Sequence, residues 1–271
     1  MATTPLERLL PNAPPGHRWA RVETGESTDQ VFRRSDGSAY AKLSDRRGAA
    51  RLEDERRRTE WLAGMGLGSP AVIDWLHCEL GACLVTAAVP GVSAAELSGA
   101  ALSAAWPSIC RQLKSLHDVP VADCPFERTL ATMFGRAVDV VARAAVNADF
   151  LLPADKGTPP AILLANVKAD LPARLAQEPG DLVVCHGDAC LPNLLVDPET
   201  LRCTGMIDLG RLGLADRYAD LALLLANASE SWSSPADAQL ARARLFDIHQ
   251  ISTPDNDRLD FYLRLDPLTW G

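Results

Sequence analysis

The pattern of apolar and polar positions changes its character once along the chain, just after residue 91. Before this point, short extended runs alternate with turns at residues 19–23, 30–34, 38–43, 70–76 and 82–86. The turn Ser35-Asp36-Gly37 is compact enough to join two of these runs as a hairpin. One stretch with helical spacing, residues 48–64, lies between the third and fourth runs. The pattern predicts a five-stranded antiparallel sheet with one helix.

The rest of the chain is dominated by alanine-rich segments with helical periodicity. They cover residues 94–118, 128–147, 161–178, 216–230, 236–249 and 255–265. Short apolar runs at 182–185, 194–196 and 203–207 interrupt them, and Pro198-Glu199-Thr200 turns the last two runs into a hairpin. We therefore expect an α+β protein with two lobes. Residues 1–91 form the N-terminal sheet lobe, which ends at the turn Pro90-Gly91, and residues 92–271 form a mostly helical lobe with small β-hairpins.

The polar residues between 183 and 211 carry the most specific chemical pattern. His186, Asp188 and Asn193 are spaced as H-x-D-x-x-x-x-N, and Asp208 follows an apolar run and precedes Gly210. This is the spacing of a kinase catalytic loop, in which the aspartate takes the acceptor hydroxyl and the asparagine holds magnesium. Two carboxylates and an amide oxygen suit Mg²⁺, a hard cation that prefers oxygen ligands. The alternative is a β-hairpin whose turns contain Asp and Asn for conformational reasons alone.

Two residues of the first lobe fit the same chemistry. Lys42 lies on the third predicted strand, and Glu55 lies on the helix that follows. A kinase pairs a strand lysine with a helix glutamate to hold the lysine against the phosphates of the nucleotide. Taken alone, Lys42 reads as a surface lysine, and the charges around Glu55 read as a solvated helix face. The combination with the loop pattern favours the kinase interpretation.

Composition and charge limit the classes of partner. The chain is 47% hydrophobic and 23% charged, which is typical of a soluble globular protein. It has no apolar run long enough to span a membrane, and its N-terminus does not resemble a signal peptide. Its seven cysteines are scattered, with no C-x-x-C pair, which predicts reduced thiols in the cytoplasm. The oligomeric state stays open.

The net charge of −8 is unevenly distributed. Residues 1–91 hold 12 basic and 12 acidic residues, and residues 92–271 hold 15 basic and 23 acidic residues. Nucleic acid and anionic membrane surfaces are poor partners for the acidic second lobe, whereas a small cationic molecule suits it. The plain alternative is that many soluble proteins are simply acidic.

The motifs together resemble those of a known family. The chain contains HGD at 186–188, LPN at 191–193, IDLGR at 207–211, ADRYADLA at 215–222, YAK at 40–42, DCPFE at 123–127 and the tail LRLDPLTWG. In these features and along nearly its whole length it resembles the aminoglycoside phosphotransferases, whose fold is similar to that of the protein kinases. Within that family, FGRAVDVV at 134–141 and the tail are most similar to the streptomycin 3''-phosphotransferases.

The resemblance implies a role for each matching residue. Asp188 would orient and deprotonate the sugar hydroxyl, while Asn193 and Asp208 would hold Mg²⁺ against the phosphates of ATP. Lys42 would contact the α- and β-phosphates, and Glu55 would position it. The other expected nucleotide-binding residues are Ser27, Ala88 and Val89, the last two through their backbone, and the supporting residues are His186, Arg211 and Asp220. The first lobe departs from other nucleotide-binding proteins because it has neither a G-x-G-x-x-G loop nor a G-x-x-x-x-G-K-[ST] loop.

The expected substrate is cationic. Streptomycin carries guanidinium groups, which pair with carboxylates in fork geometry. Asp266 matches a substrate-contacting carboxylate of the family, and the terminal carboxylate of Gly271, Asp149 and Asp155 are further candidates. Each of them is otherwise a solvated surface acid.

The sequence therefore predicts ATP-dependent phosphorylation of an aminoglycoside, with streptomycin at its 3''-hydroxyl as the expected substrate and antibiotic resistance as the outcome. Two alternatives remain: a kinase of a kanamycin-type or neomycin-type 3'-hydroxyl or of choline or homoserine, and a catalytically dead nucleotide-binding module. The complete set Lys42, Glu55, Asp188, Asn193 and Asp208 argues against the dead module. A protein kinase is disfavoured because no A-P-E motif follows Asp208.

Overall fold

The computed structural model describes residues 6–23 and 29–271. The chain folds into two compact units, one of residues 1–91 and 204–210 and the other of residues 92–203 and 211–271. The division at residue 91 coincides with the end of the predicted sheet lobe, but the short segment 204–210 joins the first unit. The backbone N–H of Met206 donates to the carbonyl of Gly68 at 2.7 Å, which fixes that segment against the first unit.

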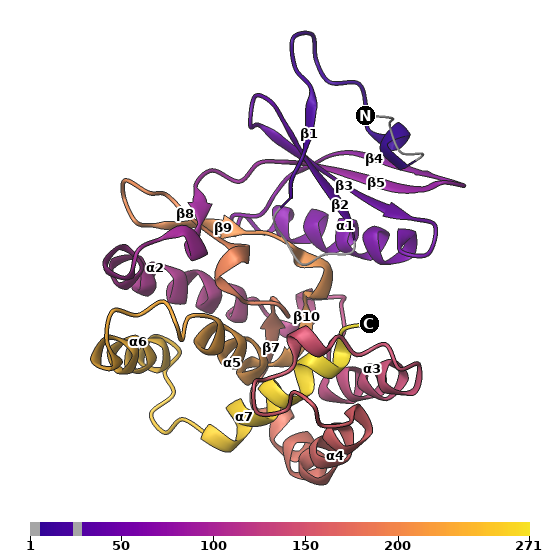
Figure 1. The fold of residues 1–271 in the computed structure, drawn as a ribbon. Helices are drawn as coiled ribbons and strands as arrows, with labels where there is room; N and C mark the ends of the chain where they lie inside the picture. Colours follow the sequence, from indigo (N-terminus) through magenta and orange to yellow (C-terminus); the bar gives the residue numbers. More distant parts are fainter. Residues whose placement is uncertain (1–5, 24–28) are drawn as a thin grey trace. The chain divides into compact units, whose positions relative to one another are not determined.

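The first unit contains the predicted antiparallel sheet and helix (Figure 1). Its elements are β1 (Trp19–Arg21), β2 (Gln30–Arg34), β3 (Ala39–Asp45), α1 (Ala49–Gly64), β4 (Val72–Cys78) and β5 (Gly81–Ala87). The strands lie in the order β1-β2-β3-β5-β4, and every neighbouring pair is antiparallel. The structure thus confirms the five strands and the helix expected from the hydrophobic pattern.

Alternation along the strands assigns side chains to two covered faces of this sheet. On one face, Leu52 of α1 packs on Ala82 and Leu84 of β5. On the other face, Ala41 and Leu43 of β3 pack with Leu9 of a short 3-10 helix, η1 (Leu6–Leu9). Because Lys42 lies between Ala41 and Leu43, the period of two turns its side chain to the face that α1 covers.

The second unit is built mainly from six α-helices (Figure 1). They are α2 (Gly99–His117), α3 (Leu130–Ala142), α4 (Pro160–Gln177), α5 (Arg217–Asn227), α6 (Pro235–Ile248) and α7 (Asn256–Leu265). Each predicted helix is confirmed, with shifted ends: α3 stops before Ala144, whose positive φ of 52° is incompatible with a right-handed helix. The indole N–H of Trp106 in α2 donates to Ala241 O in α6 at 2.7 Å. Among the described residues, no helix has the length and apolar character needed to cross a membrane.

Short strands after residue 91 flank the loop that holds the candidate catalytic residues. β7 (Leu182–Cys185), β8 (Leu194–Val196) and β9 (Cys203–Met206) confirm the three predicted runs. β6 (Val92–Ser93) and β10 (Gly213–Asp216) were not expected. β10 pairs antiparallel with β7, and Gly213 lies opposite Cys185. The helix predicted from residue 216 begins one residue later, because Asp216 is its N-cap and accepts from the backbone N–H of Tyr218.

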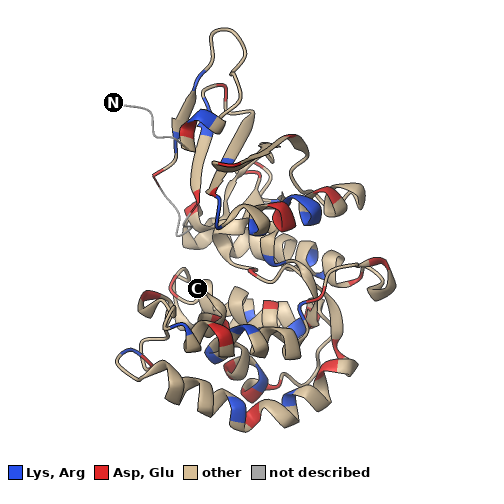
Figure 2. Ribbon diagram, turned by 90° about the vertical axis from the view of Figure 1, so that its right-hand side faces the viewer, with Lys and Arg blue, Asp and Glu red and all other residues tan. Residues whose placement is uncertain are grey.

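Charged residues of both signs are interspersed along the helices (Figure 2). In the second unit, Arg264 pairs with Asp170 at 2.8 Å, and Arg217 pairs with Asp181 at 2.9 Å. Much of the positive charge of this unit is therefore neutralised locally, and the excess of acidic residues remains as the net charge.

Candidate active site

The catalytic-loop motif lies directly after β7, in the second unit. The side-chain amide of Asn193 donates to Asp188 Oδ2 at 2.9 Å and to the backbone oxygen of Asp188 at 3.0 Å. The backbone N–H of Asp188 donates to Nδ1 of His186 at 3.2 Å, and His186 is fully buried. His186 and Asn193, at the two ends of the motif, are thus both hydrogen-bonded to Asp188. The amide nitrogen of Asn193 is engaged on the loop, which leaves its carbonyl oxygen as the atom suited to a metal ion.

Asp220 of α5 fixes the backbone at the start of this loop. Its Oδ2 accepts from the N–H of His186 at 2.7 Å, its Oδ1 accepts from the N–H of Gly187 at 2.8 Å, and Nε2 of His117 lies 3.1 Å from Oδ2. Burial acts to raise the pKa of Asp220, but the hydrogen bonds and the neighbouring histidines hold its pKa below the ordinary value. A buried carboxylate therefore stays ionised behind the loop.

Gly187 allows the chain to turn where Asp220 binds the backbone N–H groups of residues 186 and 187, an arrangement called the clamp below. Its φ is +81°, and a Cβ added there would lie 2.1 Å from the carbonyl oxygen of Arg211. Only glycine fits both the left-handed conformation and the close approach of the neighbouring backbone.

The first unit brings together the residues expected to serve the nucleotide. Nζ of Lys42 lies 2.7 Å from Glu55 Oε1 and 3.1 Å from Asp208 Oδ1. Burial acts to lower the pKa of Lys42, but the charges of Asp208 and Glu55 outweigh it and raise that pKa well above the ordinary value. Lys42 is therefore a permanent cation, held by a buried glutamate on one side and by a more exposed aspartate on the other.

Asp208 follows β9 in an unusual backbone conformation, with a positive φ of 59°. Aspartate tolerates the left-handed region better than most residues. The side chain of Asp208 is 43% exposed, so its carboxylate is open to a ligand while it also contacts Lys42.

Each unit offers, by itself, an oxygen donor of the kind that Mg²⁺ prefers. Asn193 of the second unit offers an amide oxygen, and Asp208 of the first unit offers a partly exposed carboxylate. Both are hard oxygen donors, and Mg²⁺ is commonly held through one or two carboxylates together with substrate phosphates.

The remaining nucleotide-binding predictions are placed only in part. The backbone N–H of Ala88 donates to Ser38 O at 2.9 Å, so the groups left to face an adenine edge are the carbonyl of Ala88 and the backbone of Val89. Ser27 lies outside the described residues.

The C-terminal tail surrounds a buried cluster of charges. Asp266 is 7% exposed, and its Oδ1 lies 3.4 Å from Arg128 Nη2 and 3.3 Å from Arg211 Nη2. Its Oδ2 accepts from the indole N–H of Trp270 at 2.9 Å, and the guanidinium of Arg211 stacks on that indole at 4.1 Å. Burial and the charge of Arg211 lower the pKa of Arg128 to about 10. Two arginines therefore share one carboxylate here.

The other candidate substrate residues lie at different places around this tail. Gly271 follows Trp270 at the exposed end of the chain, and Phe150 packs edge-on against Trp270, which brings the neighbouring Asp149 to the same region. Asp149 is exposed, whereas Asp155 is half-buried in the turns before α4.

Two buried residues of this region were not foreseen from the sequence. Arg128 pairs with Asp266 and packs against Gly187, and His117 contacts Asp220. Arg128 directly follows the DCPFE stretch, and this position next to a family motif was the only feature of the sequence that pointed to a role for it. A charged residue in a polar stretch is normally assigned to the surface, so neither role could be derived from local pattern.

Comparisons with known proteins agree with one another. The sequence model of the phosphotransferase enzyme family matches residues 18–265. The chain is 51% identical to a streptomycin 3''-kinase of Streptomyces griseus over 94% of each chain, and 37% identical to an aminoglycoside 3'-phosphotransferase of Streptomyces fradiae over 93% of this chain and 95% of that one. The structure of an aminoglycoside phosphotransferase of the 3'' type from Streptomyces rimosus, in complex with ADP and streptomycin, superposes with a TM-score of 0.88 at 47% identity and covers 93% of both chains. The expected fold class is thereby confirmed.

Proposed function

Because the chain belongs to the phosphotransferase enzyme family, which includes the aminoglycoside phosphotransferases, we propose that it transfers the γ-phosphoryl group of ATP to the 3''-hydroxyl of streptomycin and thereby confers resistance to that antibiotic. The observation that carries this proposal is the similarity, along almost the whole chain, to a streptomycin 3''-kinase. A similar structure that holds ADP and streptomycin supports both the donor and the acceptor.

We assign the binding of ATP, the phosphoryl donor, to residues of the first unit and to the metal ligands. Lys42, fixed by Glu55, neutralises charge on the α- and β-phosphates, and the carbonyl of Ala88 and the backbone of Val89 pair with the adenine edge. Asn193 and Asp208 are the proposed ligands of Mg²⁺, which neutralises charge on the phosphate oxygens when bound. Ser27 is the proposed loop contact to a phosphate.

We assign the positioning of the acceptor hydroxyl to the loop after β7. Asp188 accepts the hydrogen bond of the attacking hydroxyl and orients its oxygen in line with the γ-phosphorus. Positioning supplies most of the acceleration, because the transition state of phosphoryl transfer is loose and needs little help from a strong base. The bond between Asn193 and Asp188 supports this assignment, because it fixes one carboxylate oxygen and holds the carboxylate in one orientation. His186 and Asp220 support the loop from behind.

The substrate's guanidinium groups call for carboxylates near the tail. We assign this role to Asp149, Asp155, Asp266 and the terminal carboxylate of Gly271. Asp266 pairs with the guanidinium groups of Arg128 and Arg211, which is the same type of pairing that the substrate requires. Of these four groups, the exposed Asp149 is accessible for direct contact, whereas Asp266 is buried and also orders the tail.

The competing function is phosphorylation of the 3'-hydroxyl of kanamycin-type antibiotics. It is less favoured because the 3'-phosphotransferases are less similar to this chain. Small metabolites such as choline and homoserine are a more distant alternative.

A substrate panel tests the proposal. Purified protein is incubated with ATP and Mg²⁺ and with streptomycin, kanamycin, neomycin, choline or homoserine in turn, and ADP release is followed by a coupled assay. We expect turnover with streptomycin alone and a phosphorus-coupled proton at its 3'' position by NMR. The Asp188→Ala variant provides the background rate. Equal turnover of kanamycin and streptomycin would overturn the 3'' assignment.

A further inference from the structure

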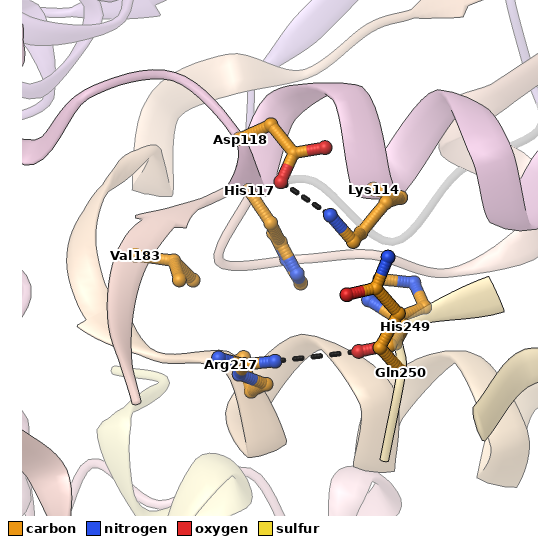
Figure 3. Close-up of a pocket in the computed structure, with 7 residues that line it drawn as sticks. All are labelled: Lys114, His117, Asp118, Val183, Arg217, His249 and Gln250. Atoms are coloured by element: carbon orange, nitrogen blue, oxygen red, sulfur yellow. Dashed lines mark hydrogen bonds and ion pairs between the residues drawn. The ribbon is translucent and has the colours of Figure 1, made fainter. Parts of the chain in front are cut away.

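A polar cavity lies within the second unit, apart from the residues assigned above to nucleotide and substrate. It has a volume of about 280 Å³ and is lined by residues of α2, β7, α5 and the end of α6, among them Lys114, His117, Arg217 and His249 (Figure 3). None of these four is in the set proposed for the phosphoryl transfer. The cavity therefore calls for its own explanation.

His249 is the least satisfied polar side chain of this cavity. It is 1% exposed, and neither of its ring nitrogens has a hydrogen-bond partner among the described residues. An unmet buried donor or acceptor costs about 1–3 kcal/mol, and such a group is normally matched by a water or a ligand. Nδ1 of His117 is likewise buried and lacks a hydrogen-bond partner within the described part of the chain. The two rings lie 5.1 Å apart, centroid to centroid.

The surroundings of His249 are positive. Burial and the nearby charges of His117, Lys114 and Arg217 lower the pKa of His249 to about 3, although Asp220 opposes them. A neutral imidazole in this position still has one N–H to donate.

Two cations flank the imidazoles, and one of them is readily available. Lys114 forms an ion pair with Asp118, one turn further along the chain (Figure 3). The side chain of Asp118 is 59% exposed, and exposed pairs of this kind contribute little and open easily. Arg217 pairs with Asp181 and also donates from Nη1 to the backbone oxygen of His249 at 3.4 Å. Lys114, Arg217 and both histidines line the cavity, and their ammonium, guanidinium and imidazole groups are its possible donors.

We propose that this cavity binds a phosphate-type oxyanion, either inorganic phosphate or a phosphomonoester, through Lys114, Arg217 and His249. Charge-assisted hydrogen bonds from ammonium and guanidinium groups to such an anion are the strong kind, and the partly closed cavity reduces competition from water. The anion also supplies an acceptor for the unmatched ring of His249.

A transition metal is the alternative that two imidazoles suggest, and the structure disfavours it. Lys114 and Arg217 would repel a divalent cation at this position. Within the described residues, the His, Cys and Asp side chains close enough for shared ligation are those of His117, Cys185 and Asp220. Burial raises the pKa of the Cys185 thiol well above its ordinary value, so that thiol stays protonated, whereas metal binding needs the thiolate.

The cavity is connected to the loop after β7 through one side chain. His117 lines the cavity and also contacts Asp220, which in turn accepts from the backbone N–H groups of His186 and Gly187. An anion that binds beside His117 changes the electrostatic environment of that ring. We therefore expect occupancy of the cavity to change the rate at which the backbone N–H groups of His186 and Gly187 exchange with solvent.

The test measures phosphate binding directly, independently of enzyme activity. Inorganic phosphate and methyl phosphate are titrated separately into the full chain at constant ionic strength, and binding is followed by calorimetry and by ³¹P line broadening. The variants are Lys114→Gln and, as a matched control, Arg111→Gln, which removes an exposed cation from the same helix but does not line the cavity. Lys42→Ala is included to remove the phosphate-binding cation proposed for the nucleotide site.

We expect saturable binding to the wild type, unchanged in Arg111→Gln and Lys42→Ala and weakened about tenfold in Lys114→Gln, the equivalent of one charge-assisted hydrogen bond. A response to methyl phosphate as strong as that to phosphate would assign the site to phosphomonoesters, and a response to phosphate alone would assign it to the free ion. Hydrogen exchange of the peptide that contains residues 186 and 187 should slow with phosphate in the wild type but not in Lys114→Gln.

Several results would overturn the proposal. Loss of binding in Lys42→Ala but not in Lys114→Gln would place the phosphate in the nucleotide site. If Lys114→Gln and Arg111→Gln weakened phosphate binding equally, the binding would depend only on the general positive charge of the surface. Absence of saturable binding would leave the cavity to water, and stabilisation by Zn²⁺ in place of phosphate would make it a metal site. None of these outcomes depends on whether streptomycin is the substrate.

Discussion

The substitution Asp220→Asn should destabilise the protein strongly, although it changes only one oxygen to an NH₂ group. The wild-type carboxylate is fully buried and receives the N–H groups of His186 and Gly187 and a contact from His117. Asparagine retains one oxygen, so one buried backbone N–H faces another donor. A lost hydrogen bond to a charged group and a stranded N–H together cost about 3 kcal/mol. For a protein of this size, that corresponds to a fall of about 6–12 °C in Tm.

The assay is thermal and urea unfolding of the wild type, Asp220→Asn and the control Asp260→Asn. Asp260 pairs with Arg264 on the surface, and its side chain is 60% exposed, so its loss should change Tm by no more than about 2 °C. If Asp220→Asn melted within the same margin of the wild type, the inference that Asp220 anchors the loop would be refuted.

The pH dependence of the difference in unfolding free energy between the wild type and Asp220→Asn provides a second check. The pKa of Asp220 is lowered in the folded state, so ionised Asp220 contributes stability that is present above its unfolded pKa of about 3.9. This contribution is lost as pH falls through the lower folded pKa. The gap in unfolding free energy between the wild type and Asp220→Asn should therefore be constant near neutral pH and shrink below about pH 4. A gap that widened on acidification would contradict the assigned direction of the shift.

Three further predictions address the reaction and the core. Asp188→Ala should lower kcat by about 10²–10⁴-fold with little change in Tm, and residual turnover above a few per cent would mean that another group aligns the hydroxyl. Lys42→Met should raise KM for ATP and lower kcat, because the phosphates lose a buried cation, and unchanged steady-state kinetics would exclude that role. Arg258→Met should cost about 3–5 kcal/mol in urea unfolding, because it strands the fully buried Asp216, whereas Arg264→Met on the same helix should cost less than about 1 kcal/mol. Equal costs for the two arginine variants would show that burial of Asp216 does not set the penalty.

Local pattern was enough to locate most of the secondary structure. Alternation of apolar residues and turn residues identified the strands of the first unit, and helical periodicity identified the six helices of the second. β10 escaped because its sequence, Gly-Leu-Ala-Asp, has no strand preference of its own, and it is extended because β7 supplies its hydrogen bonds. The premature end of α3 depends on the positive φ of Ala144, which its residue type does not signal.

The sequence by itself determined the candidate catalytic residues, because they lie at fixed short spacings within one loop or on one strand and the next helix. His186, Asp188 and Asn193 form one loop, and Lys42 and Glu55 meet because a strand and its following helix bring them to the same face of the sheet.

Only the tertiary structure decided which charges are buried and which partners they have. Arg128 and Asp266 are 138 residues apart, and His117 and Asp220 are 103 residues apart. No periodicity along the chain records such pairs, because they form where packing excludes water and leaves each charge dependent on the nearest group of opposite sign. The clamp behind the loop, the arginine pair at the tail and the cavity beside His249 were all decided by the tertiary structure.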